Sequence, residues 1–293
     1  EIKLEFKKYN IPYLLVINKI EAIDKYKLNQ LKEKYTKAIF VSTYTKEGID
    51  KLKNELISKL QNSENEIPII GNLVPYGGKV ILVVPIDSEA PKGRIILPQV
   101  QCIRDCLDNG IKIYIVRDTE LTSALQDIKD VDLVVTDSQA FKKVSKIVPE
   151  NIKLTGFSIL FANHKGDLKS FVDGVRKIDS LNKDSKILIS ESCTHNVSHE
   201  DIGRVKRPTL LNKYVGAELN YDFIVGHDFP ENIKDYDLII HCGGCMINRK
   251  TILNRINFCR KEEIPITNYG IVLAFLTGIL DRSLEIFKTK NLI

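Results

Sequence analysis

The chain has 293 residues, 43% of them hydrophobic, so it is long enough for two or three domains, each with its own core. Its 43 Lys and Arg residues against 38 Asp and Glu residues give a net charge of +5 without a concentrated basic stripe, so no nucleic-acid partner is expected. No apolar run is long enough to cross a membrane, no secretory segment is visible and the six cysteines are sparse, which together predict a cytoplasmic protein without a membrane partner.

Strand-like and helix-like segments alternate along the chain, which predicts an α/β fold of three consecutive units with mainly parallel sheets flanked by helices. No internal repeat is visible. In the first unit, residues 1–63, we expect strands at Tyr13–Ile17 and Ala38–Ser42 and helices at Lys27–Lys34 and Ile49–Leu60. The polar segment 61–66 then predicts a linker.

The second unit, residues 67–163, continues the alternation, and segment 162–167 (ANHKGD) is expected to be its boundary. Its expected elements are a strand at Val80–Pro85, a helix starting near Pro98, a strand at Ile113–Val116, a helix at Glu120–Ile128, a strand at Leu133–Thr136, a helix at Phe141–Ile147 and a closing apolar segment at Leu154–Phe161.

The third unit, residues 166–293, is expected to contain a long irregular stretch after its first strand. Its expected elements are a helix at Leu168–Ile178, strands at Ile187–Ser190, Phe223–Val225 and Leu238–His241, a helix at Thr251–Arg260, a strand at Ile264–Asn268 and a final helix from Ile271 onward.

Two cysteine–histidine motifs follow strands of the third unit. Cys193 and His195 form a C-x-H motif, and His241, Cys242 and Cys245 form an H-C-G-G-C motif. Both come just after the carboxyl ends of strands, where open α/β sheets bind ligands. The two glycines permit a tight turn, with a positive φ if needed, and their amides are placed to donate to sulfur.

Spacing alone leaves several interpretations of these motifs open. They are compatible with zinc held by three cysteines and one histidine, with an iron–sulfur cluster held by three cysteines, with a redox pair or with unrelated buried thiols. The other cysteines, Cys102, Cys106 and Cys259, follow the apolar pattern of helices and are expected in the core. The remaining histidines, expected in polar surface loops, are His164, His199 and His227.

The first unit carries a nucleotide-binding pattern. Asn18, Lys19 and Glu21 form N-K-x-E after a strand, and Ser42 with Thr43 follows the next strand. GTP-binding proteins read guanine with N-K-x-D, in which the acid accepts from the base nitrogens; Glu21 is one methylene longer. No phosphate-binding G-x-x-x-x-G-K-[ST] loop occurs, so the chain is not expected to hydrolyse GTP. Because it begins with Glu1, we expect it to be the remainder of a longer protein.

An incomplete GTPase unit followed by C-T-H and H-C-G-G-C resembles the HydF family of [FeFe]-hydrogenase maturation GTPases. The segment DSEAPKGRIILPQVQ (87–101) looks like the start of the family's dimerisation domain. The resemblance covers the whole chain, with the front of the GTPase domain missing. It implies the C-terminal part of a GTP-binding domain at 1–63, a dimerisation domain at 67–163 and an iron–sulfur domain at 166–293.

The resemblance also implies site residues, cofactors and partners. Cys193, Cys242 and Cys245 would hold a [4Fe–4S] cluster with one exchangeable iron, and His195 and His241 match the motif as further candidate ligands. GTP would bind in the intact protein, with Asn18, Lys19, Glu21 and Ser42 at the guanine position. A homodimer would receive a diiron precursor from radical-SAM maturases and deliver the diiron subcluster to apo-[FeFe]-hydrogenase.

Two other functions compete with this carrier. A zinc-stabilised regulatory GTPase of ribosome assembly or RNA modification would contain zinc and a basic face. An iron–sulfur enzyme acting on a small molecule would need acid–base groups beside the cluster, for which Glu191 and Asp201 are candidates.

Overall fold

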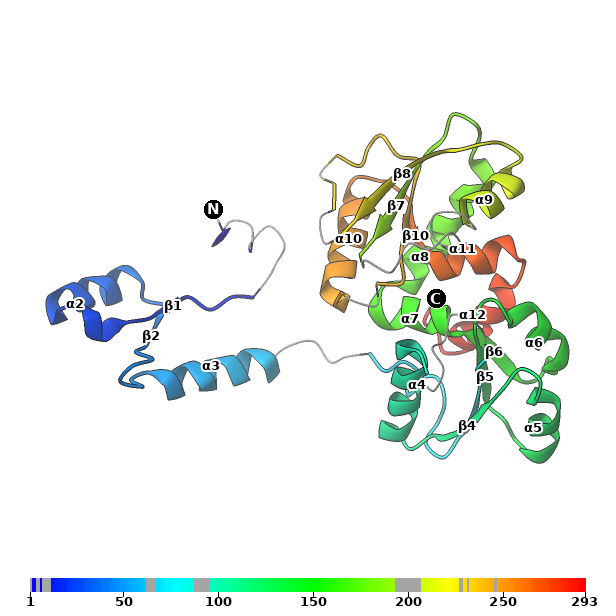
Figure 1. Ribbon diagram of the computed structural model, residues 1–293, viewed down its shortest axis with the longest axis horizontal. Coiled ribbons are helices and arrows are strands. Elements are labelled where there is room, and N and C mark those ends of the chain that lie inside the picture. The colour runs from blue at the N-terminus through cyan, green and yellow to red at the C-terminus, as the bar shows by residue number, and fades with distance from the viewer. Residues whose placement is uncertain are drawn as a thin grey trace. The chain divides into compact units, whose positions relative to one another are not determined.

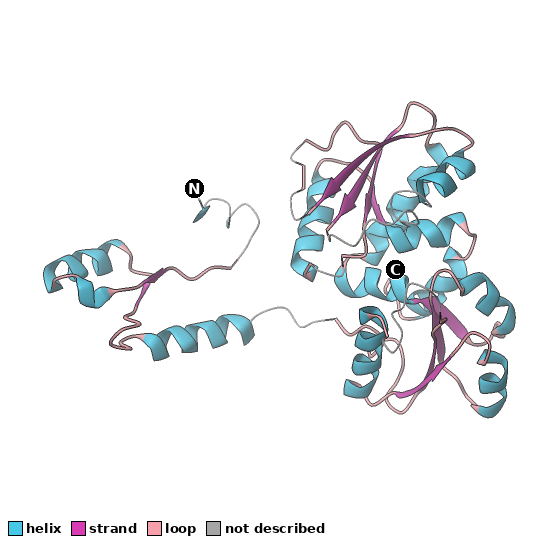
Figure 2. Ribbon diagram, in the orientation of Figure 1, coloured by secondary structure: helices cyan, strands magenta, loops and turns pink. Residues whose placement is uncertain are grey.

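The computed structural model describes residues 2, 3, 6, 12–61, 67–86, 95–192, 207–226, 229, 230, 232–244 and 247–293, with the side chains of residues 60, 61 and 207 excepted. The chain forms two compact units, residues 1–66 and 67–293. Its α/β character and parallel sheets confirm the predicted fold class (Figures 1 and 2). No helix in this part of the chain combines the length and apolar character that crossing a bilayer requires.

The first unit is built on a two-stranded parallel sheet in which Val16 pairs with Ile39 and Ile17 with Phe40. Both strands are shorter than the predicted ones, Tyr13–Ile17 and Ala38–Ser42, because only two residues of each are paired with the neighbouring strand. The elements are β1 (Val16–Ile17), η1 (Ile20–Ala22), α2 (Lys25–Lys34), β2 (Ile39–Phe40) and α3 (Ile49–Gln61).

The second unit contains two four-stranded sheets, and every strand pair in them is parallel. The first sheet has the order β4-β3-β5-β6 and is buried most deeply at Val80–Val83 and Leu133–Val135. Its elements are β3 (Lys79–Val83), α4 (Leu97–Asp108), β4 (Lys112–Val116), α5 (Leu121–Asp127), β5 (Leu133–Thr136), α6 (Phe141–Ile147), β6 (Lys153–Gly156) and α7 (Phe157–Lys165).

The second sheet has the order β10-β9-β7-β8. In chain order, each four-stranded sheet therefore places its first strand between the second and the third, a repeat of topology that the sequence did not reveal. The elements are α8 (Leu168–Val175), η2 (Arg176–Ser180), β7 (Lys186–Glu191), α9 (Arg207–Val215), β8 (Asn220–Val225), β9 (Leu238–His241), α10 (Arg249–Lys261), β10 (Ile266–Asn268), α11 (Tyr269–Leu276) and α12 (Leu280–Thr289).

Three sequence predictions need correction here. The stretch expected to be irregular contains the helix α9. The helix expected at Leu168–Ile178 changes to a 3₁₀ helix at Arg176. The final helix breaks at Gly278, whose φ of 72° is accessible to glycine at low cost. There the Ile279 N–H bonds to the Ala274 carbonyl, and the Gly278 N–H bonds to the Phe275 carbonyl, closing a Schellman turn.

The last helix packs against the first sheet of the second unit, so the two sheets are not structurally independent. Figure 1 shows α12 beside β6. The Thr155 hydroxyl on β6 donates to the Ser283 carbonyl on α12 at 2.8 Å, and Arg282 donates to the Val148 and Pro149 carbonyls. The division into domains at 67–163 and 166–293 stays a prediction, since both ranges lie within one compact unit.

Candidate functional site

The carboxyl ends of β7 and β9 form a topological switch point. These strands are neighbours, but the chain leaves β7 toward β8 on one side and β9 toward β10 on the other. Open α/β sheets bind ligands in the crevice at such a point. Ser190 pairs with His241 across the two strands, and the Cys242 N–H extends the pairing to the Ser190 carbonyl at 2.8 Å.

The structure places Cys242 at this switch point, directly after β9. Its neighbour on the β7 side is Ser192, which precedes Cys193 in the sequence. Three predicted ligands, Cys193, His195 and Cys245, lie outside the described residues. Of the predicted metal-site residues, the structure therefore locates His241 and Cys242.

The Cys242 sulfur accepts two backbone hydrogen bonds, from the Ser192 N–H at 3.2 Å and the Gly244 N–H at 3.4 Å. Gly244 has a φ of 64°, a backbone conformation in which any side chain would be strained. The sequence predictions of a positive φ and an amide donor in this loop are both confirmed at Gly244.

The surroundings of Cys242 favour its thiolate form. Burial raises the pKa of the thiol, whereas the N–H groups of Ser192 and Gly244, which donate to the sulfur, lower it by stabilising the thiolate. A thiolate is the form that binds metals. N–H donors to sulfur are also a known means by which proteins tune iron–sulfur clusters, so Cys242 fits a cluster ligand.

His241 lies in a buried polar network with Ser192 and Arg255, each at most 4% exposed. One guanidinium nitrogen of Arg255, Nη1, contacts His241 Nε2 at 2.7 Å and donates to Ser192 Oγ at 2.8 Å. Because arginine only donates, Nε2 must accept and His241 must be neutral. Its Nδ1 then carries the proton and donates to the Cys242 carbonyl at 2.6 Å.

The loop that follows Cys242 is held by contacts with the end of α7. Lys165 Nζ donates to the Gly244 carbonyl at 3.1 Å and to the Ile247 carbonyl at 3.3 Å. Arg249, the first residue of α10, donates from Nη1 to the carbonyls of Asn163, His164 and Gly166 at 3.0, 2.6 and 2.9 Å. These contacts fasten both ends of the segment 244–249 to one helix terminus.

His164 differs from its prediction as a surface residue in a polar loop. It belongs to α7, is partly buried, and its Nδ1 hydrogen-bonds the Ile67 carbonyl at 2.5 Å. The apolar run Phe157–Ala162 supplies a buried helix face, so the helix continues through the polar ANHK letters to its end before Gly166. His199 and His227 lie outside the described residues.

The cysteines predicted to belong to the core are confirmed. Cys102, Cys106 and Cys259 are fully buried, and burial raises the pKa of the Cys106 and Cys259 thiols to about 12. These thiols stay protonated at neutral pH. Among the described residues no three His, Cys, Asp or Glu side chains converge as a metal site, and the remaining cysteines of the two motifs lie outside that part of the chain.

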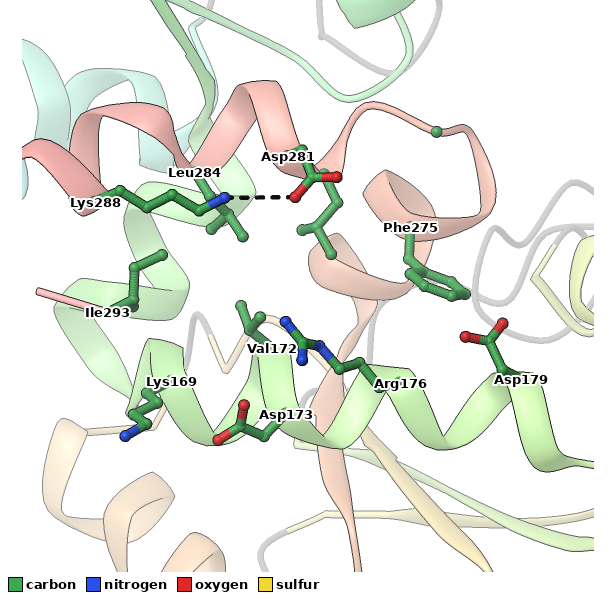
Figure 3. Close-up of a pocket in the computed structure, with 12 residues that line it drawn as sticks. Lys169, Val172, Asp173, Arg176, Asp179, Phe275, Asp281, Leu284, Lys288 and Ile293 are labelled. Atoms are coloured by element: carbon green, nitrogen blue, oxygen red, sulfur yellow. Dashed lines mark hydrogen bonds and ion pairs between the residues drawn. The ribbon is translucent and has the colours of Figure 1, made fainter.

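Of the two acid–base candidates, the structure describes Glu191, at the end of β7. The Glu191 carboxylate accepts a hydrogen bond from the Tyr269 hydroxyl at 3.0 Å, and Asp201 is outside the described residues. A cavity of about 540 Å³ lies elsewhere, between α8 with η2 and α11 with α12 (Figure 3). Its lining carries side chains of both charges, among them Arg176 and an ion pair in which Lys288 lies 3.5 Å from Asp281.

In the first unit, the residues of the nucleotide pattern lie just after β1 and β2. The Thr43 N–H donates to Asn18 Oδ1 at 3.2 Å, and Asn18 Nδ2 donates to Thr43 Oγ1 at 3.4 Å. A hydrogen bond from the Ser42 side chain lowers the pKa of the Glu21 carboxyl, which keeps it an anionic acceptor. Lys19, with a φ of 63°, makes the turn between Asn18 and Glu21.

The sequence prediction missed three residues that shape the site: Ser192, Lys165 and Arg255. Only Arg255 left a signal, since it occupies a helix position three residues after Ile252 and four before Cys259, on the buried face of α10. A basic residue on such a face requires a buried partner.

The comparison with known families covers most of the second unit. Residues 69–166 match the Hydrogen maturase F dimerization domain, and residues 169–286 match the Hydrogen maturase F tetramerization domain. No curated protein matches the chain. Both matched domains are self-association domains of one protein family, and together they span most of the 293 residues. The chain therefore belongs to the hydrogen maturase F (HydF) family, whose role is in hydrogenase maturation.

Proposed function

We propose that the chain is a scaffold and carrier in the assembly of the [FeFe]-hydrogenase active site. Cys193, Cys242 and Cys245 would hold a [4Fe–4S] cluster with one exchangeable iron. The cargo is a diiron subcluster, received as a precursor from radical-SAM maturases and passed to apo-hydrogenase. A cluster with three thiolate ligands supplies an iron coordination position to which a transferable group can bind.

One observation carries this proposal: the Cys242 thiol at the switch point, with two N–H donors to its sulfur. The other cysteines in the described residues lack this environment, as Cys259 illustrates with its raised pKa. A protein that needed only a packed thiol after β9 would gain nothing from amide donors aimed at sulfur. The buried Ser190 hydroxyl, which has no hydrogen-bond partner among the described residues, adds a further polar atom near this strand end.

Anaerobic purification followed by iron, sulfide and zinc analysis, with EPR after reduction, tests the proposal. We expect iron and sulfide with a cluster spectrum, lost in Cys242→Ser and kept in Cys259→Ala, a matched variant on a cysteine of the same unit. Zinc alone would instead favour the zinc-stabilised regulatory GTPase. A cluster spectrum unchanged by Cys242→Ser would refute the ligand assignment.

The contact between Asn18 and Thr43 and the Glu21–Ser42 pair support guanine binding as part of this function in the intact protein. Both place amide and carboxylate groups at the ends of neighbouring parallel strands, where a base edge can be read. Saturation-transfer NMR of the chain with guanosine and with adenosine tests this. We expect transfer to guanosine alone and its loss in Asn18→Ala; equal transfer to adenosine would contradict guanine recognition.

Self-association through the first sheet of the second unit is the proposed route to a homodimer. Strand β4 lies at the edge of this sheet, and its Ile115 is 45% exposed. Beside it, α4 exposes Leu97, Val100 and Leu107, so a second copy would cover apolar surface and unpaired strand edge at once.

A further inference from the structure

Arg255 is a buried cation that joins two separate strand ends. It belongs to α10, is 4% exposed, and its Nη1 contacts Ser192 after β7 and His241 at the end of β9. These two residues directly precede Cys193 and Cys242. A single guanidinium nitrogen therefore touches the neighbour of each cysteine, although the two cysteines come from different strands.

The geometry also fixes what His241 does. With Nε2 accepting from Arg255 and Nδ1 donating to the Cys242 carbonyl, both ring nitrogens are engaged by the protein. An imidazole binds iron through an unprotonated nitrogen, and the unprotonated one here faces Arg255. This arrangement therefore does not favour the predicted role of His241 as a metal ligand. It favours a role in which His241 braces Cys242, that is, holds its backbone in place through the hydrogen bond to its carbonyl.

Burial of a guanidinium is costly unless its hydrogen bonds and charge are compensated. Part of that compensation comes from Phe229, whose ring lies 5.2 Å from the guanidinium carbon, and from the Ser192 and His241 acceptors. Ser192, which accepts from Arg255 through its hydroxyl, also donates its N–H to the Cys242 sulfur, so one residue links the guanidinium to this cysteine.

We propose that Arg255 is a positioning residue for the metal centre: it clamps the ends of β7 and β9 at a fixed spacing and holds His241 as the neutral Nδ1–H tautomer, so that His241 braces Cys242 without binding iron. This inference rests on the proposed function, because it assigns the clamp to the cysteines that would hold the cluster. The clamp itself is a property of the chain without metal.

Three variants and a control separate this role from a general effect on folding. Arg255→Met keeps the length of the apolar stem but removes the donors. His241→Gln keeps an oxygen acceptor for Arg255 while removing the imidazole, and His241→Ala removes both. Arg260→Met is the matched control, since Arg260 lies on the same helix and makes an exposed ion pair with Asp167.

The first readout needs no metal. In the full chain labelled with ¹⁵N-histidine, the imidazole signal that His241→Gln removes should show a protonated Nδ1 and an accepting Nε2, and Arg255→Met should change that pattern while Arg260→Met does not. Far-UV circular dichroism establishes that each variant is folded. An unchanged imidazole pattern in folded Arg255→Met would overturn the clamp.

The second readout is the retention of iron against a chelator, together with the EPR signal of the reduced protein. Residues that orient metal ligands cost about 10- to 100-fold in metal affinity when removed, and we expect a loss of this size in Arg255→Met and His241→Ala. His241→Gln should retain iron and the wild-type signal. A His241→Gln variant as defective as His241→Ala, or an Arg255→Met variant as retentive as wild type, would overturn the inference.

The two readouts keep this inference distinct from the proposed function. A wild type that binds no cluster, with the expected imidazole pattern, refutes the scaffold function and with it the metal role of the clamp. A wild type that binds a cluster, lost in Cys242→Ser but unaffected by Arg255→Met, refutes the clamp alone.

Discussion

Replacing Arg249 with Met should destabilise the second unit by detaching the loop after Cys242 from α7. The Arg249 guanidinium donates from Nη1 to three carbonyls at the end of α7, at 2.6 to 3.0 Å. Methionine retains the apolar stem contacts but leaves these carbonyls without their cation. The carbonyls belong to the last turn of α7 and to its cap, where a positive charge also favours the helix dipole.

The size of the effect follows from the number of protons. Nη1 carries two, so it makes two full bonds and shares the third acceptor. Hydrogen bonds to charged groups contribute about 1.5–3 kcal/mol each, and the side chain is only partly buried, so we expect a loss of about 2–4 kcal/mol in the free energy of unfolding.

Urea denaturation of the full chain, followed by far-UV circular dichroism, measures this loss, and amide exchange locates it. We expect faster exchange in the last turn of α7. Arg260→Met provides the control, because its exposed ion pair with Asp167 is worth at most about 1 kcal/mol. A destabilisation by Arg249→Met no larger than that of the control would refute the reasoning.

Three further predictions follow from other parts of the structure. Phe287→Ala, at a fully buried position of α12, should cost about 3–5 kcal/mol and accelerate amide exchange in β6 as well, because α12 packs on that strand; exchange confined to α12 would contradict this. Burial raises the pKa of Asp167, but hydrogen bonds from Ser170 and Arg260 lower it below its usual value, so its stabilisation is present above the unfolded pKa of about 3.9 and is lost as pH falls through the folded pKa. Asp167→Asn, which retains a helix-capping oxygen, should therefore reduce the drop in urea midpoint between pH 7 and pH 3, and an equal drop would refute this assignment. Ile115→Lys at the β4 edge should reduce the oligomer mass measured by light scattering, whereas an unchanged mass would place self-association elsewhere.

The local elements of the second unit were largely predictable from the sequence. Apolar runs such as Val80–Val83 and Leu238–Ile240 are buried strands, and the alternation of strands with helices predicts parallel pairing. The same local logic predicted the core cysteines and the role of Gly244, whose positive φ and amide donor were expected from the glycines of the C-G-G-C motif.

Some local predictions were wrong because a competing local signal was stronger. The polar letters 162–167 suggested a boundary, but the apolar run before them continued α7 to Lys165. The final helix broke at Gly278, where a Schellman turn competes with helix continuation. The helix α9 begins at Arg207 in a stretch that had too little apolar periodicity to be recognised.

The sequence by itself determined the residue types of the candidate centre and their position after strand ends. Only the tertiary structure decided that β7 and β9 are neighbours, that Arg255 joins their ends and that α12 returns to β6. The physical reason is that strand order and buried polar pairing depend on contacts between residues far apart in the chain, which hydrophobic periodicity does not encode. Arg255 could be recognised as an oddity on an apolar helix face, but its partners, Ser192 and His241, were set by the packing of the helix against the sheet.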